Sequence, residues 1–221
     1  MSKKPKGPIK AFNAPLTDEQ KIVKARILNN SITLLKGKAG SSKTFLACNV
    51  ALDMLQKGDT EKIYIARPFV YAENEMEIGI LPGTIQDKLI GITTPIIENM
   101  YLIMGKEKVD ALITEGIINI LPVAFMRGMT LNNSVFIIDE CQNLTLSATY
   151  TALSRIGHGT KTILTGDMTQ CDLKNKKDSG FDFFKKLEIE KLPGFEIIEL
   201  KENHRHDLVE KITAIYMDYK N

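Results

Sequence analysis

Short apolar runs alternate along the chain with longer segments in which apolar positions recur at helical spacing. Apolar, β-branched runs of this length predict buried strands. The strands predicted in this way cover residues 31–36, 62–66, 134–140, 161–167 and 195–200, with a further candidate at 117–120. Several of the runs are apolar on both faces, which is typical of parallel strands covered by helices on both sides.

Helices are predicted in the segments between these strands. The first begins after Thr17, because Thr17 and Gln20 have the spacing of a capping box. The second follows the first strand, covers residues 43–57 and is closed by Gly58. This alternation of strand and helix predicts an α/β fold with a parallel sheet flanked by helices.

Helical patterns are also present further along the chain. Residues 84–115 form a helix-rich stretch after a Pro-Gly turn. In the next predicted helix, Leu146, Tyr150 and Leu153 share one face, and Gly157 is the stop signal. The last segment predicts an amphipathic helix with an inner face made of Leu208, Val209, Ile212, Ile215 and Tyr216.

The composition is that of an ordinary globular chain. The 221 residues are 43% hydrophobic and 25% charged, and this length suits one domain. Residues 1–14, which are rich in lysine, are predicted to form a flexible basic arm, and residues 15–221 to form the domain. No apolar run reaches the ~18 residues of a membrane-spanning helix, so we expect no membrane partner.

The cysteines and the net charge say little about partners. Cys48, Cys141 and Cys171 are scattered without metal-binding spacing, so we expect reduced thiols in a cytoplasmic protein. The formal net charge of +2 neither requires nor excludes nucleic acid. The lysine cluster in residues 174–177 is either a solvated loop or a contact for a phosphate backbone.

A glycine-rich loop between the first strand and the second helix carries the clearest candidate for chemistry. The segment GKAGSSKT matches the phosphate-binding pattern G-x-x-x-x-G-K-[ST] in all fixed positions but one. Lys43 is predicted to reach the β- and γ-phosphates of ATP, and Thr44 to bind Mg²⁺. The backbone N–H groups of the loop would cradle phosphate. The nucleotide-binding residues predicted here are Gly37, Lys38, Ala39, Gly40, Ser41, Ser42, Lys43 and Thr44.

Ser42 is the position at which the loop departs from the pattern. Glycine at this position lets the backbone approach phosphate without a Cβ, and serine is the next smallest polar residue. A serine is also well tolerated in the first turn of a helix. We therefore expect nucleotide binding to be weakened but retained.

Two carboxylates, Asp139 and Glu140, follow the apolar run VFII. Ligands of parallel sheets bind at the carboxyl ends of the strands, so this pair is expected beside the phosphate loop. Asp139 is predicted to hold Mg²⁺ through water, and Glu140 to orient and deprotonate the attacking water. A base for water favours an ATPase over a phosphotransferase, which must exclude water.

A further strand ends in polar residues in the segment ILTGDMTQ. Thr165, Gly166, Asp167 and Gln170 are predicted to lie beside the γ-phosphate and to sense it. A simple turn after a strand explains Gly166 and Asp167 equally well.

ATP hydrolysis usually needs a cation on the transferring phosphoryl group, and four arginines are candidates. Arg205 is the first choice, because it precedes the last helix, where subunit contacts are expected. The alternatives Arg67, Arg127 and Arg155 would each also suit a surface ion pair. Gln20 has two interpretations: its amide recognises the edge of adenine, or it only completes the capping box.

Taken in order, these motifs resemble the PhoH family of P-loop ATPases, which are related to superfamily 1 helicases. The resemblance covers roughly residues 15–216. Beyond the loop it is carried by RPFVYAENEMEIGILPG (67–83), LPVAFMRGMTLNN (121–133), IIDECQN (137–143), LSRIG (153–157), LTGDMTQCDL (164–173) and the pair Arg205-His206.

The resemblance implies a RecA-like core that hydrolyses ATP with Mg²⁺ and is coupled to single-stranded nucleic acid, RNA rather than DNA, with helicase-like activity. It also implies that Gln142 belongs to a helicase-type second motif with Asp139 and Glu140. Some members carry a fused nuclease domain, and at this length we expect none and therefore no nuclease activity. The family usually has glycine where this chain has Ser42 and alanine where it has Cys141.

Helicases of this class usually close two RecA-like lobes around ATP, and this chain is long enough for one. A neighbouring subunit could supply the missing wall and an arginine, which favours a homo-oligomeric ring, expected to be a hexamer. The resulting prediction is an ATPase in a ring. The alternatives are a nucleotide-gated nucleic-acid-binding scaffold with negligible turnover, which Ser42 favours, and a phosphotransferase.

Overall fold

A six-stranded parallel sheet forms the centre of the protein. The computed structural model describes residues 15–68 and 85–202, and beyond them residues 208, 209, 211, 212, 215 and 219. The strand order is β3-β2-β4-β5-β1-β6, which confirms the predicted α/β fold. The strands are β1 (Ile32–Lys36), β2 (Lys62–Ala66), β3 (Ile118–Ile120), β4 (Ser134–Ile138), β5 (Lys161–Gly166) and β6 (Phe195–Glu199).

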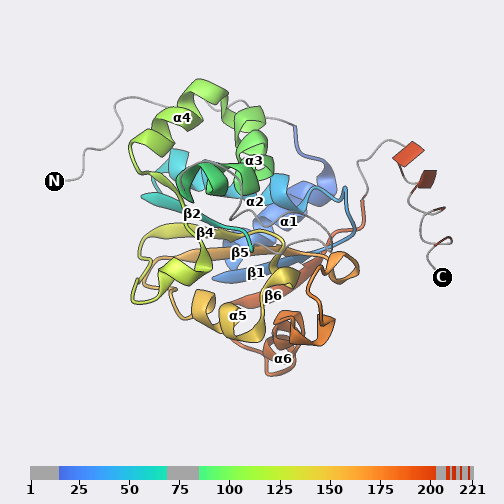
Figure 1. Ribbon diagram of the computed structural model, residues 1–221. Helices are drawn as coiled ribbons and strands as arrows, with labels where there is room; N and C mark the ends of the chain where they lie inside the picture. Colours follow the sequence, from blue (N-terminus) through green and yellow to red (C-terminus); the bar gives the residue numbers. More distant parts are fainter. Residues whose placement is uncertain are drawn as a thin grey trace.

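Helices cover both faces of this sheet (Figure 1). Helices α1 to α4 lie on one side and α5 and α6 on the other. Their bounds are α1 (Asp18–Asn29), α2 (Lys43–Lys57), α3 (Ile85–Met104), α4 (Lys106–Thr114), α5 (Leu146–Leu153) and α6 (Phe181–Ile189). Four short 3-10 turns complete the described elements: η2 (Val123–Met126), η3 (Cys141–Asn143), η4 (Met168–Gln170) and η5 (Lys176–Asp178). Within the described residues, no helix is long and apolar enough to span a membrane.

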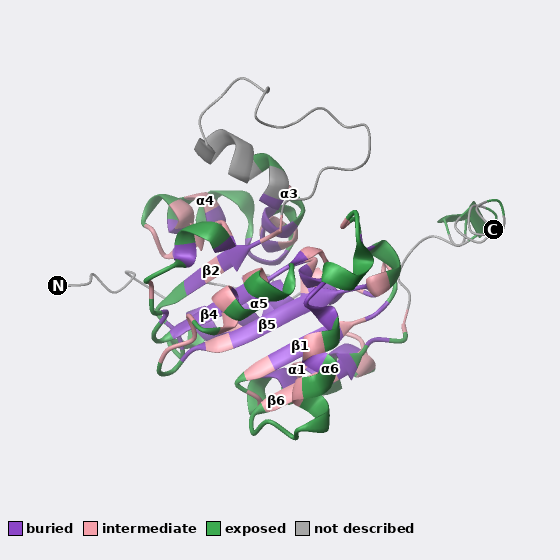
Figure 2. Cartoon of the chain, turned by 60° about the horizontal axis from the view of Figure 1, so that its bottom comes forward, coloured by how far each residue is buried: buried purple, intermediate pink, exposed green. Residues whose placement is uncertain are grey.

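Two hydrophobic cores lie on opposite sides of the sheet. Successive residues of a strand point to opposite faces, so Leu35 joins the core under α2 and α3, while Leu34 joins the other core with Phe136 and Phe184. The sheet is accordingly buried on both faces (Figure 2). This arrangement explains why the strand sequences are apolar without alternation.

The predicted start and end signals of the first two helices are confirmed. Thr17 is the N-cap of α1, and Gln20 completes the capping box by accepting a hydrogen bond from the Thr17 N–H at 3.1 Å. Gly58 ends α2 with a φ of 79°, a left-handed conformation that favours glycine. These local signals are sufficient because both ends of each interaction lie within a few residues in sequence.

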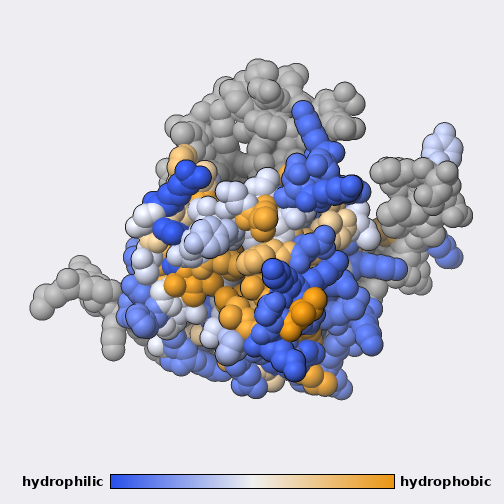
Figure 3. All heavy atoms as spheres, turned by 90° about the horizontal axis from the view of Figure 1, so that it is seen from below, coloured by the Kyte–Doolittle hydropathy of each residue, from blue (hydrophilic) through white to orange (hydrophobic). Residues whose placement is uncertain are grey.

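The apolar face predicted for α5 points largely to solvent. Leu146 is 54% exposed and Tyr150 68%, whereas Thr149 and Ala152 are buried. The chain passes very close to Thr149 on this buried side: a Cβ on Gly180 would lie 2.1 Å from Thr149 Oγ1, so glycine is needed at position 180. The side of the molecule seen in Figure 3 accordingly has hydrophobic side chains at its surface next to hydrophilic ones.

The described residues of the inner face predicted for the C-terminal helix are also not buried. Leu208, Val209, Ile212 and Ile215 are helical but 58%, 37%, 56% and 70% exposed, while Tyr216 lies outside the described residues. The amphipathic pattern identified an apolar face, but a pattern cannot say which surface will cover that face. The proposed basic arm at residues 1–14 likewise lies outside the described residues.

Candidate nucleotide-binding site

Three neighbouring strands bring the predicted motifs to one edge of the sheet. Strand β5 lies between β1 and β4, with Lys36 opposite Gly166 and Ile138 opposite Leu164. The loop after β1, the acidic pair after β4 and the polar segment after β5 therefore meet at the carboxyl ends of the strands, where ligands of parallel sheets bind. Strands β4 and β5 end one or two residues earlier than predicted, which places the acids just beyond the sheet.

The phosphate loop connects β1 to α2 in a tight turn. Glycine is required at Gly37, because a Cβ there would lie 2.6 Å from Ser41 Oγ and 3.0 Å from the Leu200 carbonyl oxygen. Gly40 has a φ of 89°, which again favours glycine. The Ser41 N–H and hydroxyl both donate to the Lys38 carbonyl, at 3.2 and 2.9 Å.

Ser42 adopts a left-handed backbone conformation, with φ 60° and ψ 23°. It is the N-cap of α2, but its side chain makes no capping hydrogen bond. Residues other than glycine lose ~1–2 kcal/mol in this conformation. The sequence interpretation was therefore incomplete: Ser42 does not sit in a first helical turn, and glycine suits the position for its backbone freedom as well as its size.

The Lys43 ammonium lies inside the loop. Its Nζ donates to the carbonyl oxygens of Gly37 at 2.7 Å and Lys38 at 2.9 Å, and the residue is only 8% exposed. A phosphate oxygen would form a charge-assisted hydrogen bond, which is stronger than a bond to a neutral carbonyl. Lys43 is thus held where an anionic ligand of the loop would meet it.

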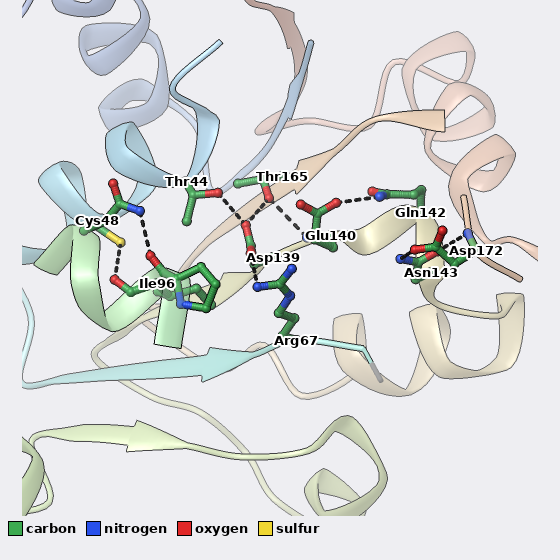
Figure 4. A network of polar contacts seen from close by, with 12 residues as sticks. Thr44, Cys48, Arg67, Ile96, Asp139, Glu140, Gln142, Asn143, Thr165 and Asp172 are labelled. Carbon is green, nitrogen blue, oxygen red and sulfur yellow. Dashed lines mark hydrogen bonds and ion pairs between the residues drawn. The ribbon is translucent and has the colours of Figure 1, made fainter. Parts of the chain in front are cut away.

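Thr44 and Asp139 form the contact on which a metal site would be built. The Thr44 hydroxyl donates to Asp139 Oδ1 at 2.7 Å, and Asp139 is 2% exposed (Figure 4). A hydroxyl and a carboxylate are hard oxygen donors of the kind that Mg²⁺ prefers when it also binds phosphates and water. The residues present therefore fit Mg²⁺.

Two further side chains hold Asp139. The Thr165 hydroxyl donates to Oδ1 at 2.6 Å, and Arg67 Nη1 lies 3.8 Å from Oδ2. Strand pairing brings Arg67 there. Ala66 and Ile138 are the last paired residues of β2 and β4, and they are followed by Arg67 and Asp139, respectively. The cation beside a nearly buried carboxylate offsets part of the cost of burying its charge.

Glu140 is fixed at both its backbone and its side chain. Its φ of 54° is left-handed, and its N–H donates to Thr165 Oγ1 at 3.2 Å. Its Oε2 accepts a hydrogen bond from Gln142 Nε2 at 2.5 Å. The carboxylate that sequence reasoning chose as the base thus has a defined direction (Figure 4).

Gln142 connects the acidic pair to the segment after β5. It is fully buried, its Nε2 also donates to the Gln170 carbonyl at 3.2 Å, and its Oε1 accepts from the Asp167 N–H at 3.1 Å. The sequence placed Gln142 in a motif by resemblance, without a role of its own. In the sequence, the signal for this connecting role was its position two residues after Glu140. In the structure, Gln142 lies on the 3-10 turn η3.

Gln170 and Asp167 bond to each other. Gln170 Nε2 donates to Asp167 Oδ2 at 2.6 Å, and the N–H and hydroxyl of Thr169 donate to Oδ1 at 3.0 and 2.7 Å. Burial acts to raise the pKa of Asp167, but these hydrogen bonds and the charge of Lys43 outweigh it, so its pKa lies below the ordinary value. The Gln170 amide is therefore near the site and engaged within its own turn.

The remaining predicted residues lie elsewhere or are not described. Arg155 donates to the Met129 carbonyl at 3.3 Å, in the turn that leads to the amino end of β4, so it is not part of the site in this subunit. Arg127 is exposed at the end of η2, and Arg205 lies outside the described residues. Gln20 forms the capping box, which leaves its proposed adenine contact untested.

The comparisons with known proteins agree with this geometry. A family model described as PhoH-like protein matches residues 14–217. The chain belongs to the PhoH-like family. It is 34% identical over 205 residues to a PhoH-like protein of Synechocystis sp., covering 92% of this chain and 61% of the relative. It is 36% identical over 194 residues to a PhoH-like protein of Bacillus subtilis, covering 87% and 60%.

The PhoH-like chain thus spans about three fifths of the length of these relatives. Among solved structures, the large terminase of a thermophilic bacteriophage superposes with a TM-score of 0.57 at 10% identity, covering 90% of this chain and 50% of the terminase chain. The likeness concerns the fold. The fold of the PhoH-like chain is thus a RecA-like parallel sheet flanked by helices, as the sequence predicted.

Proposed function

We propose that this PhoH-like protein is an Mg²⁺-dependent ATPase. The observation that carries the proposal is the continuous hydrogen-bonded path from Thr44 of the phosphate loop through Asp139 and Thr165 to Glu140. The path joins a metal-binding pair to a carboxylate that can act on water, within reach of Lys43 and the loop. These are the parts that phosphoryl transfer to water requires.

Each residue has a defined task in this proposal. Lys43 and the loop from Gly37 to Thr44 bind the phosphates, Thr44 and Asp139 hold Mg²⁺, and the metal neutralises charge on the phosphates when bound. Glu140 takes the proton of the attacking water. Gln170 reads the γ-phosphate after release from Asp167, Gln20 contacts adenine, and Arg205 stabilises the transferring phosphoryl group.

The proposal extends to partners. A homo-oligomeric ring, expected to be a hexamer, would let one subunit complete the nucleotide site of the next. We also propose that ATP hydrolysis is coupled to the binding of single-stranded nucleic acid, RNA rather than DNA, in a helicase-like cycle. The protein would act in the cytoplasm. The three free, buried cysteines suit a reducing compartment.

Steady-state ATP hydrolysis tests the function directly. The wild type is compared with Lys43→Ala and Glu140→Gln, each with and without single-stranded RNA or DNA. Glu140→Gln should keep nucleotide affinity and lose ~10²–10⁴-fold in kcat, as expected for a lost general base. Hydrolysis by Glu140→Gln within about threefold of wild type would contradict the base assignment.

The second candidate function is a nucleotide-gated nucleic-acid-binding scaffold with negligible turnover. The left-handed conformation of Ser42 favours it, because strain in the phosphate loop is the feature that would slow turnover. Tight ATP binding by the wild type, with phosphate release no faster than in Lys43→Ala, would select this function over the ATPase.

A further inference from the structure

One hydroxyl in the site bonds to both members of the acidic pair. Thr165 is the penultimate residue of β5 and is 1% exposed. Its Oγ1 lies 2.6 Å from Asp139 Oδ1 and 3.2 Å from the backbone nitrogen of Glu140. A carboxylate can only accept and an N–H can only donate. The Thr165 hydroxyl therefore acts both as a donor, to the Asp139 carboxylate, and as an acceptor, from the Glu140 N–H.

The Thr165 hydroxyl accepts the hydrogen bond of the Glu140 N–H in place of a carbonyl from a neighbouring strand. Strand β4 ends at Ile138, and the last ladder bond beyond it runs from the Asp139 N–H to the Ala66 carbonyl at 2.9 Å. At Glu140 the chain turns into a left-handed conformation with φ 54°. Such a conformation in a non-glycine residue persists only when its surroundings hold it. Thr165 is the side chain that receives the Glu140 N–H.

Other threonines of the same sheet show that this bonding is specific. Thr33 on β1 and Thr162 on β5 are fully buried, and their hydroxyls have no hydrogen-bond partner in the structure. A buried threonine in this sheet can therefore be present for its β-branched shape alone. At Thr165, in contrast, the hydroxyl connects two functional residues, so shape alone does not account for it.

We propose that Thr165 is a positioning residue that sets the direction of Asp139 and the backbone of Glu140 together. This inference rests on the proposed ATPase function and changes the task first expected of Thr165, from sensing the γ-phosphate to holding the acidic pair. Loss of the hydroxyl would let Asp139 turn away from Thr44 and would free Glu140 from its left-handed conformation. The Mg²⁺ requirement and kcat should change, while metal-free nucleotide affinity should not.

The test uses three substitutions in the full chain. Thr165→Val keeps the shape and removes the hydroxyl, Thr165→Ser keeps the hydroxyl and removes the methyl group, and Thr162→Val is the matched control on the same strand. We measure kcat and KM for ATP, the Mg²⁺ concentration at half-maximal rate, and the binding of a fluorescent ATP analogue with and without Mg²⁺. Thermal unfolding midpoints establish that each variant is folded.

Thr165→Val should lower kcat at least ~10-fold, below the ~10²–10⁴-fold ceiling for loss of the base itself, and should raise the Mg²⁺ requirement. Thr165→Ser should restore both within about threefold, and Thr162→Val should match wild type. Hydrolysis by Thr165→Val within threefold of wild type at unchanged Mg²⁺ requirement would overturn the proposal. Weaker metal-free nucleotide binding by Thr165→Val at unchanged kcat would also overturn the proposal. It would indicate that Thr165 contacts the γ-phosphate, as first expected from the sequence.

The binding measurements separate this inference from the proposed function. If the wild type binds ATP without hydrolysing it, the ATPase proposal fails, and Thr165 is then judged on the Mg²⁺ dependence of binding. A weaker Mg²⁺ effect on analogue binding in Thr165→Val than in Thr162→Val would support the positioning role. Equal Mg²⁺ effects in the two variants would contradict it.

Discussion

Ser42 shows how one backbone conformation can limit a binding loop. Its φ of 60° lies in the region that glycine enters freely and serine enters at a cost of ~1–2 kcal/mol. Neighbouring loop residues do not share this cost, because the positive φ of the loop otherwise falls on Gly40. The serine at position 42, where the phosphate-binding pattern has glycine, therefore introduces strain in the backbone of the loop.

We predict that Ser42→Gly tightens nucleotide binding and slightly stabilises the fold. The relieved strain is partly offset by the greater freedom of glycine in the unfolded chain, which leaves a gain of about 0.5 kcal/mol. Urea unfolding and titration with a fluorescent ATP analogue measure the two effects.

Lys191→Gly is the matched control for this prediction, because Lys191 also has a left-handed φ, of 52°, but is exposed at the end of α6. It should gain similar stability and leave nucleotide affinity unchanged. Unchanged affinity in Ser42→Gly as well would show that the serine does not limit binding.

At the scale of elements, Lys161 joins the first helix to the sheet. It is the first residue of β5, and its Nζ donates to the carbonyls of Ile27 at 3.0 Å and Leu28 at 3.1 Å, and to that of Asn30. These carbonyls belong to the last turn of α1 and to its C-cap residue, Asn30, where a cation is favoured by the helix dipole. Burial lowers the pKa of Lys161, and the three carbonyl contacts offset part of that cost.

We predict that Lys161→Met destabilises the protein by ~1–2 kcal/mol, since it leaves helix C-terminal carbonyls without their donor. Lys62→Met is the control, because Lys62 is likewise the first residue of its strand, β2, but is exposed. Urea midpoints compare the two variants. Equal midpoints would mean that water replaces the lysine at the end of α1 without loss.

At the scale of the whole molecule, several large apolar side chains are exposed outside the two hydrophobic cores. Ile212 and Ile215 in the C-terminal segment are 56% and 70% exposed, and Ile189 at the end of α6 is 76% exposed. Isolated exposed apolar residues are common, whereas several at helical spacing suit an interface. The C-terminal pair is therefore a better candidate than Ile189 for contact between subunits of the proposed ring.

We predict that Ile212→Glu reduces assembly, because a charge would be buried in the subunit contact, while Ile189→Glu leaves assembly unchanged. Light scattering with and without ATP and Mg²⁺ measures the molar mass of each variant. A strictly monomeric wild type under both conditions would refute the ring, and equal assembly of the two variants would place the contact elsewhere.

The sequence by itself determined the local elements and the identity of the fold. Thr17, Gln20 and Gly58 act on backbone groups a few residues away, so the helix ends could be predicted from spacing. Doubly apolar strands between helices were sufficient for the parallel sheet. The phosphate loop and the acidic pair were recognisable because their chemistry depends on residue types in a fixed order.

Tertiary structure alone decided which groups meet across the sheet. The bonds of Thr165 to Asp139 and Glu140, and the position of Arg67, depend on strand order and register. The sequence does not state that β5 lies between β1 and β4. The exposure of Leu146 and Tyr150 on α5 could not be predicted from the sequence for a similar reason, because an apolar face is a property of one helix, whereas burial also depends on the surface that approaches it.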